Sequence, residues 1–196
     1  MQAYQAGDVR FIDQNNDGRI DIKDRISLGS AAPDYFGGFY TNFRYRHFAL
    51  SAEFAYSKGN KAYNAVRRTL ESASSFSNQS VAVSNRWSGE GQVTDMPRAT
   101  FGDAIGNNNF SSRWIEDASY LRIKNITLSY NFDKPIWNFF RSGTIYVTGE
   151  NLLTATKYLG LDPEFAYSSS DNATQGFDYA KVMQPKSVKL GINLKF

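Results

Sequence analysis

The chain has 196 residues, contains no cysteine, carries a formal net charge of +3 and has a mean hydropathy of −0.48. It holds no run of about 18 apolar residues, which excludes helical membrane spans, and the lack of thiols excludes disulfides and thiolate metal sites. The charge is too small, and its Lys and Arg residues too scattered, to predict a nucleic-acid partner. The first residues lack the basic and apolar segments of a signal peptide, so an exported protein with this sequence is expected to be a fragment.

The first motif along the chain is an acidic loop that fits the twelve-residue pattern of calcium loops. Gly18 stands at position 6, where such loops need a sharp turn. The expected ligands are Asp13, Asn15, Asp17, Asp21 and Asp24, with the carbonyl group of Arg19 at position 7. Hard oxygen ligands favour calcium, so we expect a structural ion. An Asx-rich turn without an ion is the alternative, because position 12 lacks the usual Glu and no flanking helices are evident.

Two alternating segments follow and predict a β-hairpin. Apolar and polar residues alternate from Phe39 to Tyr45 and again from Phe48 to Tyr56, with a tight turn near His47 between them. A period of two places each set on its own face of a sheet. Since His47 is the sole histidine and lies in this turn, we expect it to be solvated rather than a general base.

A long connection over residues 59–118 separates the hairpin from the next strand. Within it, residues 62–71 form the one segment that is predicted to be helical. The third strand is expected from Ser119 to Phe132, but its apolar residues change phase part of the way along. A β-bulge near Lys124 and Asn125, or an upper part of the strand that stands clear of lipid, would explain this change.

The last two strands are predicted from Gly143 to Asn151 and from Lys186 to Phe196. The final segment alternates strictly, and a length of about 9–11 residues suits a tilted strand that crosses a bilayer. Its apolar residues are Val188, Leu190, Ile192, Leu194 and Phe196. A terminal aromatic residue is typical of the last strand of an outer-membrane barrel, so this segment favours a membrane over a soluble sandwich.

The connections between the predicted strands alternate between long and short. Outer-membrane barrels have long extracellular loops and short periplasmic turns. We therefore expect 1–35, 59–118 and 152–185 outside the cell, and the turn at His47 and the link 133–142 in the periplasm. Aromatic residues of that link are expected to form part of an interfacial girdle. They are Trp137, Phe139 and Phe140.

No combination of residues predicts catalysis, so we assign no catalytic residue and expect no enzyme. A glycosidase needs two carboxyl groups that face one cleft about 5–9.5 Å apart, and nothing in the sequence brings Glu53 and Glu150 together. The long connections also carry rings that we expect to be exposed and to contact cargo or a partner. These are Trp87, Trp114, Tyr158, Tyr167 and Tyr179. Packing of these rings within the loops is the alternative.

Several short motifs follow one another along the chain. They are Gly7–Asp13, Pro33–Phe39, Gly59–Asn60 with Tyr63–Asn64, Asp95–Ala99, Ile115–Asn125, Gly149–Thr154 and Leu190–Phe196. In this order they resemble the C-terminal part of SusC/RagA-like TonB-dependent outer-membrane transporters. The resemblance implies an all-β fold in which residues 36–196 hold the last five antiparallel strands of a large transmembrane barrel with long extracellular loops. It also implies an extracellular segment over 1–35, a missing plug domain, and an open curved sheet when the chain stands alone.

The resemblance further implies a place in the cell outer membrane, contact with its lipid, and import of oligosaccharides or peptides with a SusD-like surface lipoprotein. TonB would act through the missing N-terminal part, so this segment supplies wall and loops. A secreted, soluble calcium-binding β-domain for adhesion or carbohydrate binding is the alternative. Burial distinguishes the two, because the apolar residues of the last strand stay exposed in a barrel wall and are covered in a soluble domain.

Overall fold

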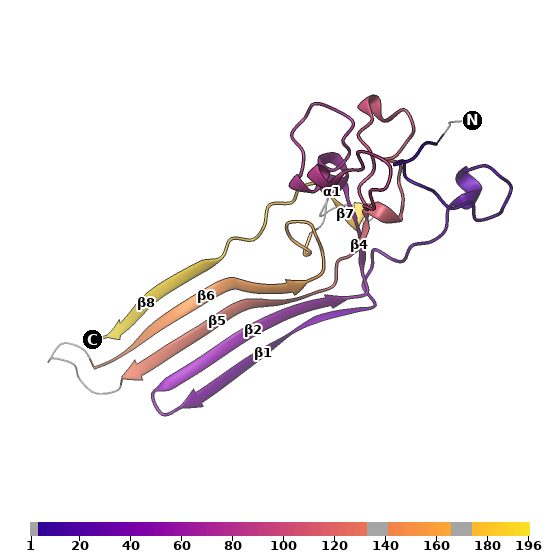
Figure 1. Cartoon of the computed structure of the whole chain (residues 1–196). Coiled ribbons are helices and arrows are strands. Elements are labelled where there is room, and N and C mark those ends of the chain that lie inside the picture. The colour runs from indigo at the N-terminus through magenta and orange to yellow at the C-terminus, as the bar shows by residue number, and fades with distance from the viewer. Residues whose placement is uncertain (1–3, 133–140, 166–173) are drawn as a thin grey trace. The chain divides into compact units, whose positions relative to one another are not determined.

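A computed structural model of the chain describes residues 4–132, 141–165 and 174–196 (Figure 1). The described residues divide into two compact units, which we name the loop unit and the sheet unit. The loop unit comprises the described residues of Met1–Gly29, Ala62–Glu116 and Ala166–Ala180, and the sheet unit those of Ser30–Lys61, Asp117–Phe165 and Lys181–Phe196. Among the described residues, no helix is both long and apolar enough to span a membrane.

The sheet unit contains one open sheet of five antiparallel strands, in the order β1-β2-β5-β6-β8. The strands are β1 Tyr35–Tyr45, β2 Phe48–Lys58, β5 Tyr120–Phe132, β6 Ser142–Thr156 and β8 Ser187–Lys195. They lie side by side in one layer (Figure 1). All five predicted strands and the turn near His47 are thus confirmed, as is the open sheet. The predicted girdle residues Trp137, Phe139 and Phe140 lie outside the described residues.

The predicted bulge in β5 is confirmed by the strand register. Ile123 pairs with Phe54 and Asn125 pairs with Glu53, so Lys124 has no opposite residue on β2. One extra residue reverses the phase of the strand. The apolar residues before and after the bulge therefore share one face of the sheet, although the sequence places them on opposite phases.

The loop unit is built around a small sheet of short strands, in the order β4-β3-β7. These are β3 Lys61–Asn64, β4 Ile115–Asp117 and β7 Phe177–Asp178, and they are accompanied by the α-helix α1 Ala65–Leu70. Short 3-10 helices span Ile22–Asp24, Val81–Asn85, Phe101–Asp103 and Ser112–Trp114. The prediction of a helix from residue 62 is wrong at its start. The side chain of Asn64 accepts a hydrogen bond from the N–H of Arg67 at 2.8 Å and so caps the helix, which begins only after Asn64.

The N-terminal segment up to Gly29 belongs to the loop unit. Arg98 donates to the carboxylate of Asp8 at 2.7 Å, and the backbone N–H of Arg98 donates to the carbonyl group of Gly7 at 2.9 Å. Asn107 donates to Asp8 at 3.1 Å, and Trp87 packs against Gly7. The hydrogen bonds from Arg98 outweigh burial and hold the pKa of Asp8 below its usual 3.8. These contacts fasten residues 7–8 to the long connection.

Candidate functional site

The sheet has one apolar face that is largely exposed. Residues that face each other across antiparallel strands lie on the same face, and complete apolar rows cross all five strands. One row is Tyr45, Phe48, Tyr130, Ile145 and Ile192, and the next is Phe43, Leu50, Leu128, Val147 and Leu190. On β8, Val188 is 72% exposed and Leu190 is 81% exposed, while Leu194 is half-buried. This exposure does not favour the soluble alternative, in which such residues are covered.

The opposite face of the same strands is polar and hydrogen-bonded. A row of Asn42, Ser51, Thr127, Thr148 and Lys189 crosses it. The hydroxyl groups of Thr127 and Thr148 lie 2.8 Å apart, and Lys189 donates to Glu150 at 2.6 Å. Glu53 also lies on this face, in register with Asn125 and Glu150. An apolar outer face and a polar inner face are what a barrel wall needs between lipid and an aqueous lumen.

A cluster of charges with a buried centre lies on the polar face. Arg122 is 3% exposed and Asp162 is 2% exposed at their side chains, and the two form an ion pair. Arg122 also donates to Glu164 at 2.9 Å, and Lys124, the bulged residue of β5, donates to Glu164 at 2.7 Å. The cluster therefore holds the segment that follows β6 against the polar face. This cluster was not predicted from the sequence.

The charged state of Asp162 follows from its hydrogen bonds. Burial opposes ionisation, but hydrogen bonds from Arg122 and from the backbone N–H groups of Glu164 and Gln184 outweigh it. They hold the pKa of Asp162 below its usual 3.8. A buried carboxylate is tolerated when a cation and hydrogen bonds satisfy it, so Asp162 stays ionised.

The rings that were predicted to be exposed on the long connections differ in their burial. Trp114 is 0% exposed and Tyr158 is 6% exposed, so the prediction of exposure is wrong for these two. Trp114 fills the core of the loop unit, and Tyr158 packs within the sheet unit. Trp87 is half-buried and Tyr179 is 56% exposed. Tyr167 lies outside the described residues.

Tyr179 lies at one end of a series of contacting aromatic rings in the loop unit, which we call the aromatic row. It consists of Phe110, Tyr63, Phe177 and Tyr179. Adjacent ring centroids are 4.9, 5.3 and 6.2 Å apart along the row. The central ring, Tyr63, is buried, whereas Phe110 is 57% exposed. The row thus presents two exposed rings, one beside the buried Tyr63 and the other beside the half-buried Phe177. Phe110 and Phe177 were not predicted from the sequence.

The acidic loop folds around its first and last carboxylates. Asp13 accepts hydrogen bonds from the N–H groups of Asp17 at 3.2 Å and Gly18 at 2.8 Å, and Gly18 has a φ of 77°. Asp24 accepts from the N–H groups of Asp21 at 2.7 Å and Gln14 at 2.8 Å, and these bonds lower its pKa below the usual 3.8. Among the described residues, no three His, Asp or Glu side chains are grouped as metal ligands. The calcium site therefore stays a prediction.

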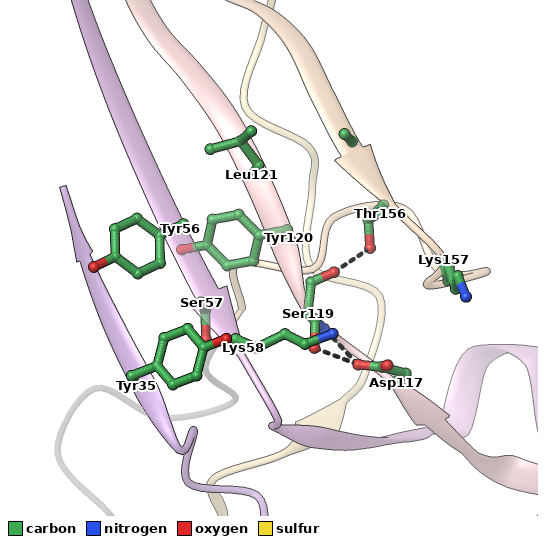
Figure 2. A pocket seen from close by; sticks show the side chains of 11 residues that line it. Tyr35, Tyr56, Ser57, Lys58, Asp117, Ser119, Tyr120, Leu121, Thr156 and Lys157 are labelled. Atoms are coloured by element: carbon green, nitrogen blue, oxygen red, sulfur yellow. Dashed lines mark hydrogen bonds between the residues drawn. The ribbon is translucent and has the colours of Figure 1, made fainter. Parts of the chain in front are cut away.

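A hollow of about 530 Å³ lies at one end of β1, β2, β5 and β6 (Figure 2). Three tyrosines, Tyr35, Tyr56 and Tyr120, and two lysines, Lys58 and Lys157, contribute to its lining. At the edge of the hollow, the carboxylate of Asp117 accepts hydrogen bonds from the hydroxyl and N–H groups of Ser119 at 2.5 and 2.9 Å. These bonds lower the pKa of Asp117. The hollow is therefore a mixed polar and apolar site.

The known proteins that this chain resembles in sequence are all TonB-dependent receptors among those compared below. The chain is 32% identical over 196 residues to TonB-dependent receptor P26 of Formosa agariphila, 33% identical over 196 residues to TonB-dependent receptor P3 of the same organism, and 29% identical over 190 residues to TonB-dependent receptor SusC of Bacteroides thetaiotaomicron. The matches cover 97, 97 and 95% of this chain but 20, 19 and 17% of the relatives. The chain thus spans about a fifth of the length of the curated relatives it matches. No family model matches it.

Solved structures agree with these relatives. The RagAB peptide transporter superposes with a TM-score of 0.73 at 26% identity, over 91% of this chain and 19% of that chain. The RagAB peptide importer in the "closed-closed" state gives a TM-score of 0.70 at 26% identity, over 92% of this chain and 20% of that chain. Both the sequence and the open, two-faced sheet therefore match one kind of protein. The chain therefore resembles the SusC/RagA-like TonB-dependent receptors over almost its whole length, and its open sheet matches a portion of their outer-membrane β-barrel.

Proposed function

We propose that this chain forms part of the cargo-facing wall and of the extracellular loops of an importer for oligosaccharides or peptides. The two-faced sheet is the main support for this proposal. One face has exposed apolar rows, and the other has hydrogen-bonded hydroxyl, amide and charged groups. A polar lumenal wall suits a hydrated cargo. TonB acts through a part of the whole transporter that lies outside this chain.

The loop unit is proposed to contact a SusD-like surface lipoprotein. Exposed aromatic rings that are positioned by buried neighbours are typical of the residues that dominate binding energy at interfaces. Phe110 and Tyr179 have this character, because each is more than half exposed and each stacks on another ring of the aromatic row. The RagAB structures that resemble this chain include a "closed-closed" and an "open-open" state of that importer.

Replacing Phe110 and Tyr179 together by alanine in the full-length transporter is expected to weaken binding of the lipoprotein by about 30-fold or more, because residues of this kind contribute about 2 kcal/mol or more. Binding of the purified lipoprotein to the purified transporter measures the change, and uptake by cells should fall with it. Phe76→Ala is the matched control, since Phe76 is 95% exposed in the same unit but lies outside the aromatic row. Equal binding by the double variant and the control would contradict this role for the row.

The acidic loop is proposed to hold one structural calcium ion. The loop places Gly18 in the left-handed conformation that position 6 requires, and its N–H binds the carboxylate of Asp13. The side-chain oxygens of Asn15, Asp17, Asp21 and Asp24, together with the carbonyl group of Arg19, suit calcium chemically. In the extracellular space an affinity of about 10⁻⁴–10⁻³ M is sufficient, and the ion would stiffen the segment before β1.

Replacing Asp13 and Asp17 by alanine is expected to abolish calcium binding by the full-length protein in calorimetry, because both ligands and the charge that attracts the cation are lost. A control variant, Glu90→Ala with Asp95→Ala, removes two carboxylates elsewhere in the loop unit and should bind calcium normally. Binding that is unchanged in the first variant, or reduced equally in both, would show that the loop is an Asx-rich turn without an ion.

A further inference from the structure

The hollow at the strand ends lies on the apolar face of the sheet. Tyr56, Leu121 and Ala155 are successive register partners on that face. Tyr35 pairs with Lys58, which lies two residues beyond Tyr56 and therefore on the same face. All of them line the hollow. Neighbouring residues whose side chains point to the polar face also line the hollow. Its lining nevertheless extends along the apolar face through Leu121 and Ala155. The hollow is therefore part of the outward surface of the barrel wall.

The chemistry of the hollow is divided between a basic rim and an apolar floor. Lys58 and Lys157 are exposed, and the rings of Tyr35 and Tyr56 meet edge to face with centroids 6.3 Å apart. Figure 2 shows Lys58 beside Tyr35, with its side chain extended toward Asp117, and Tyr56 and Leu121 further along the sheet. Ammonium and phenol groups donate hydrogen bonds to phosphate oxygens.

The only carboxylate that lines the hollow, among the described residues, is already bound. Asp117 accepts two hydrogen bonds from Ser119, which lower its pKa, and the positive charges of Lys61 and Lys58 lower it further. One carboxylate cannot neutralise the two lysines of the rim. An excess of positive charge therefore remains where the apolar face ends.

Beyond the floor, the apolar face continues down the strands through Phe54, Ile123 and Leu153, which are register partners. Leu153 is 56% exposed. An occupant of the hollow thus meets cations and hydroxyl groups at one end and a continuous hydrocarbon surface at the other. A lipid with an anionic headgroup has this polarity, whereas a hydrated cargo does not.

We propose that this hollow binds a membrane lipid through its phosphate-bearing headgroup, with Lys58 and Lys157 as the cationic contacts and Tyr35 and Tyr56 as hydrogen-bond donors. Aromatic and basic side chains collect at the membrane interface, and each basic residue near an anionic surface contributes about 1 kcal/mol. The acyl chain lies along the apolar face below. This inference rests on the proposed function, because it requires the sheet to be a wall in the outer membrane.

The test uses the full-length transporter in phosphatidylcholine nanodiscs that contain phosphatidylglycerol as the anionic probe. Lys58→Ala with Lys157→Ala is expected to weaken phosphatidylglycerol binding by about tenfold or more. Lys189→Ala with Lys195→Ala removes the same charge from the polar face and should leave binding unchanged. Tyr35→Phe keeps the ring but removes its hydroxyl group, and is expected to weaken binding about two- to tenfold. Native mass spectrometry counts the lipids retained.

The results of these experiments distinguish a lipid site from a site for free anions and from the absence of a site. Equal lipid binding by the two double-lysine variants would overturn the site. Displacement of phosphatidylglycerol by millimolar inorganic phosphate would show a site for free anions rather than for a lipid. Since Tyr35→Phe keeps charge and shape, it tests the site even if the lysine variant fails to assemble. Failure of the proposed function would be seen instead in the unmodified transporter, as a lack of cargo uptake, whatever lipid it binds.

Discussion

Replacing Arg122 by alanine in the full-length transporter is expected to lower the free energy of unfolding by about 3–5 kcal/mol, because the carboxylate of Asp162 would stay buried without its cation. Both side chains are almost fully buried, at 3% and 2% exposure, so solvent cannot replace the lost partner. The change is measured as a shift in the midpoint of denaturant unfolding. The heat-dependent mobility of the barrel on a gel monitors the folded fraction.

Two further variants separate this effect from the loss of any charge pair. Lys189→Ala breaks an ion pair with Glu150 whose lysine is 60% exposed, and exposed pairs contribute about 0–1 kcal/mol. Removing Arg122 and Asp162 together should recover part of the loss, because no unpaired buried charge remains. If Arg122→Ala were no worse than Lys189→Ala, the cluster would not hold the segment after β6.

The contribution of Asp162 also has a defined dependence on pH. Its pKa is lower in the folded protein than the usual 3.8, so its stabilising effect is fully present above pH 3.8. As the pH falls below this value and through the folded-state pKa, the carboxylate takes up a proton and the effect is lost. The difference in stability between the unmodified protein and Asp162→Asn should therefore shrink in that acidic range.

The sheet was predictable from the sequence because its signals are local. Alternation with a period of two identifies each strand, and the phase change beside Lys124 identifies the bulge. The end of β6 was predicted too early, at Asn151. This residue has a φ of 51° and lies opposite the bulge, where the pairing is interrupted before Leu153 pairs again with Ile123. A local irregularity of this kind resembles the end of a strand.

The contacts that build the site were not predictable, because they join distant residues with no periodic signal. Arg98 and Asp8 are 90 residues apart, and Arg122 and Asp162 are 40 residues apart. The burial of Trp114 has the same origin. Its ring packs with Tyr63 and Ala65 and lies under two guanidinium groups, so a loop tryptophan that suggested an exposed surface is instead a core residue.

The orientation of the wall is tested by placing one charge on each of two adjacent residues of β8. Ile192 lies in an apolar row and is 57% exposed, whereas Asn193 faces the polar side opposite Thr144. In a barrel wall, arginine on the lipid face costs about 2–4 kcal/mol near the bilayer midplane and less toward the interfaces. Arginine on the lumenal face stays in water, and such surface changes usually cost less than about 0.5 kcal/mol.

We therefore expect Ile192→Arg to reduce strongly the amount of folded, heat-resistant transporter in the outer membrane, while Asn193→Arg assembles at a normal level. The two variants share the strand, the depth and the added charge, so only the face differs between them. Reduced assembly of both would point to a general intolerance of β8 to long side chains. Greater damage from Asn193→Arg than from Ile192→Arg would mean that the polar face meets lipid, and the assignment of the two faces would have to be reversed.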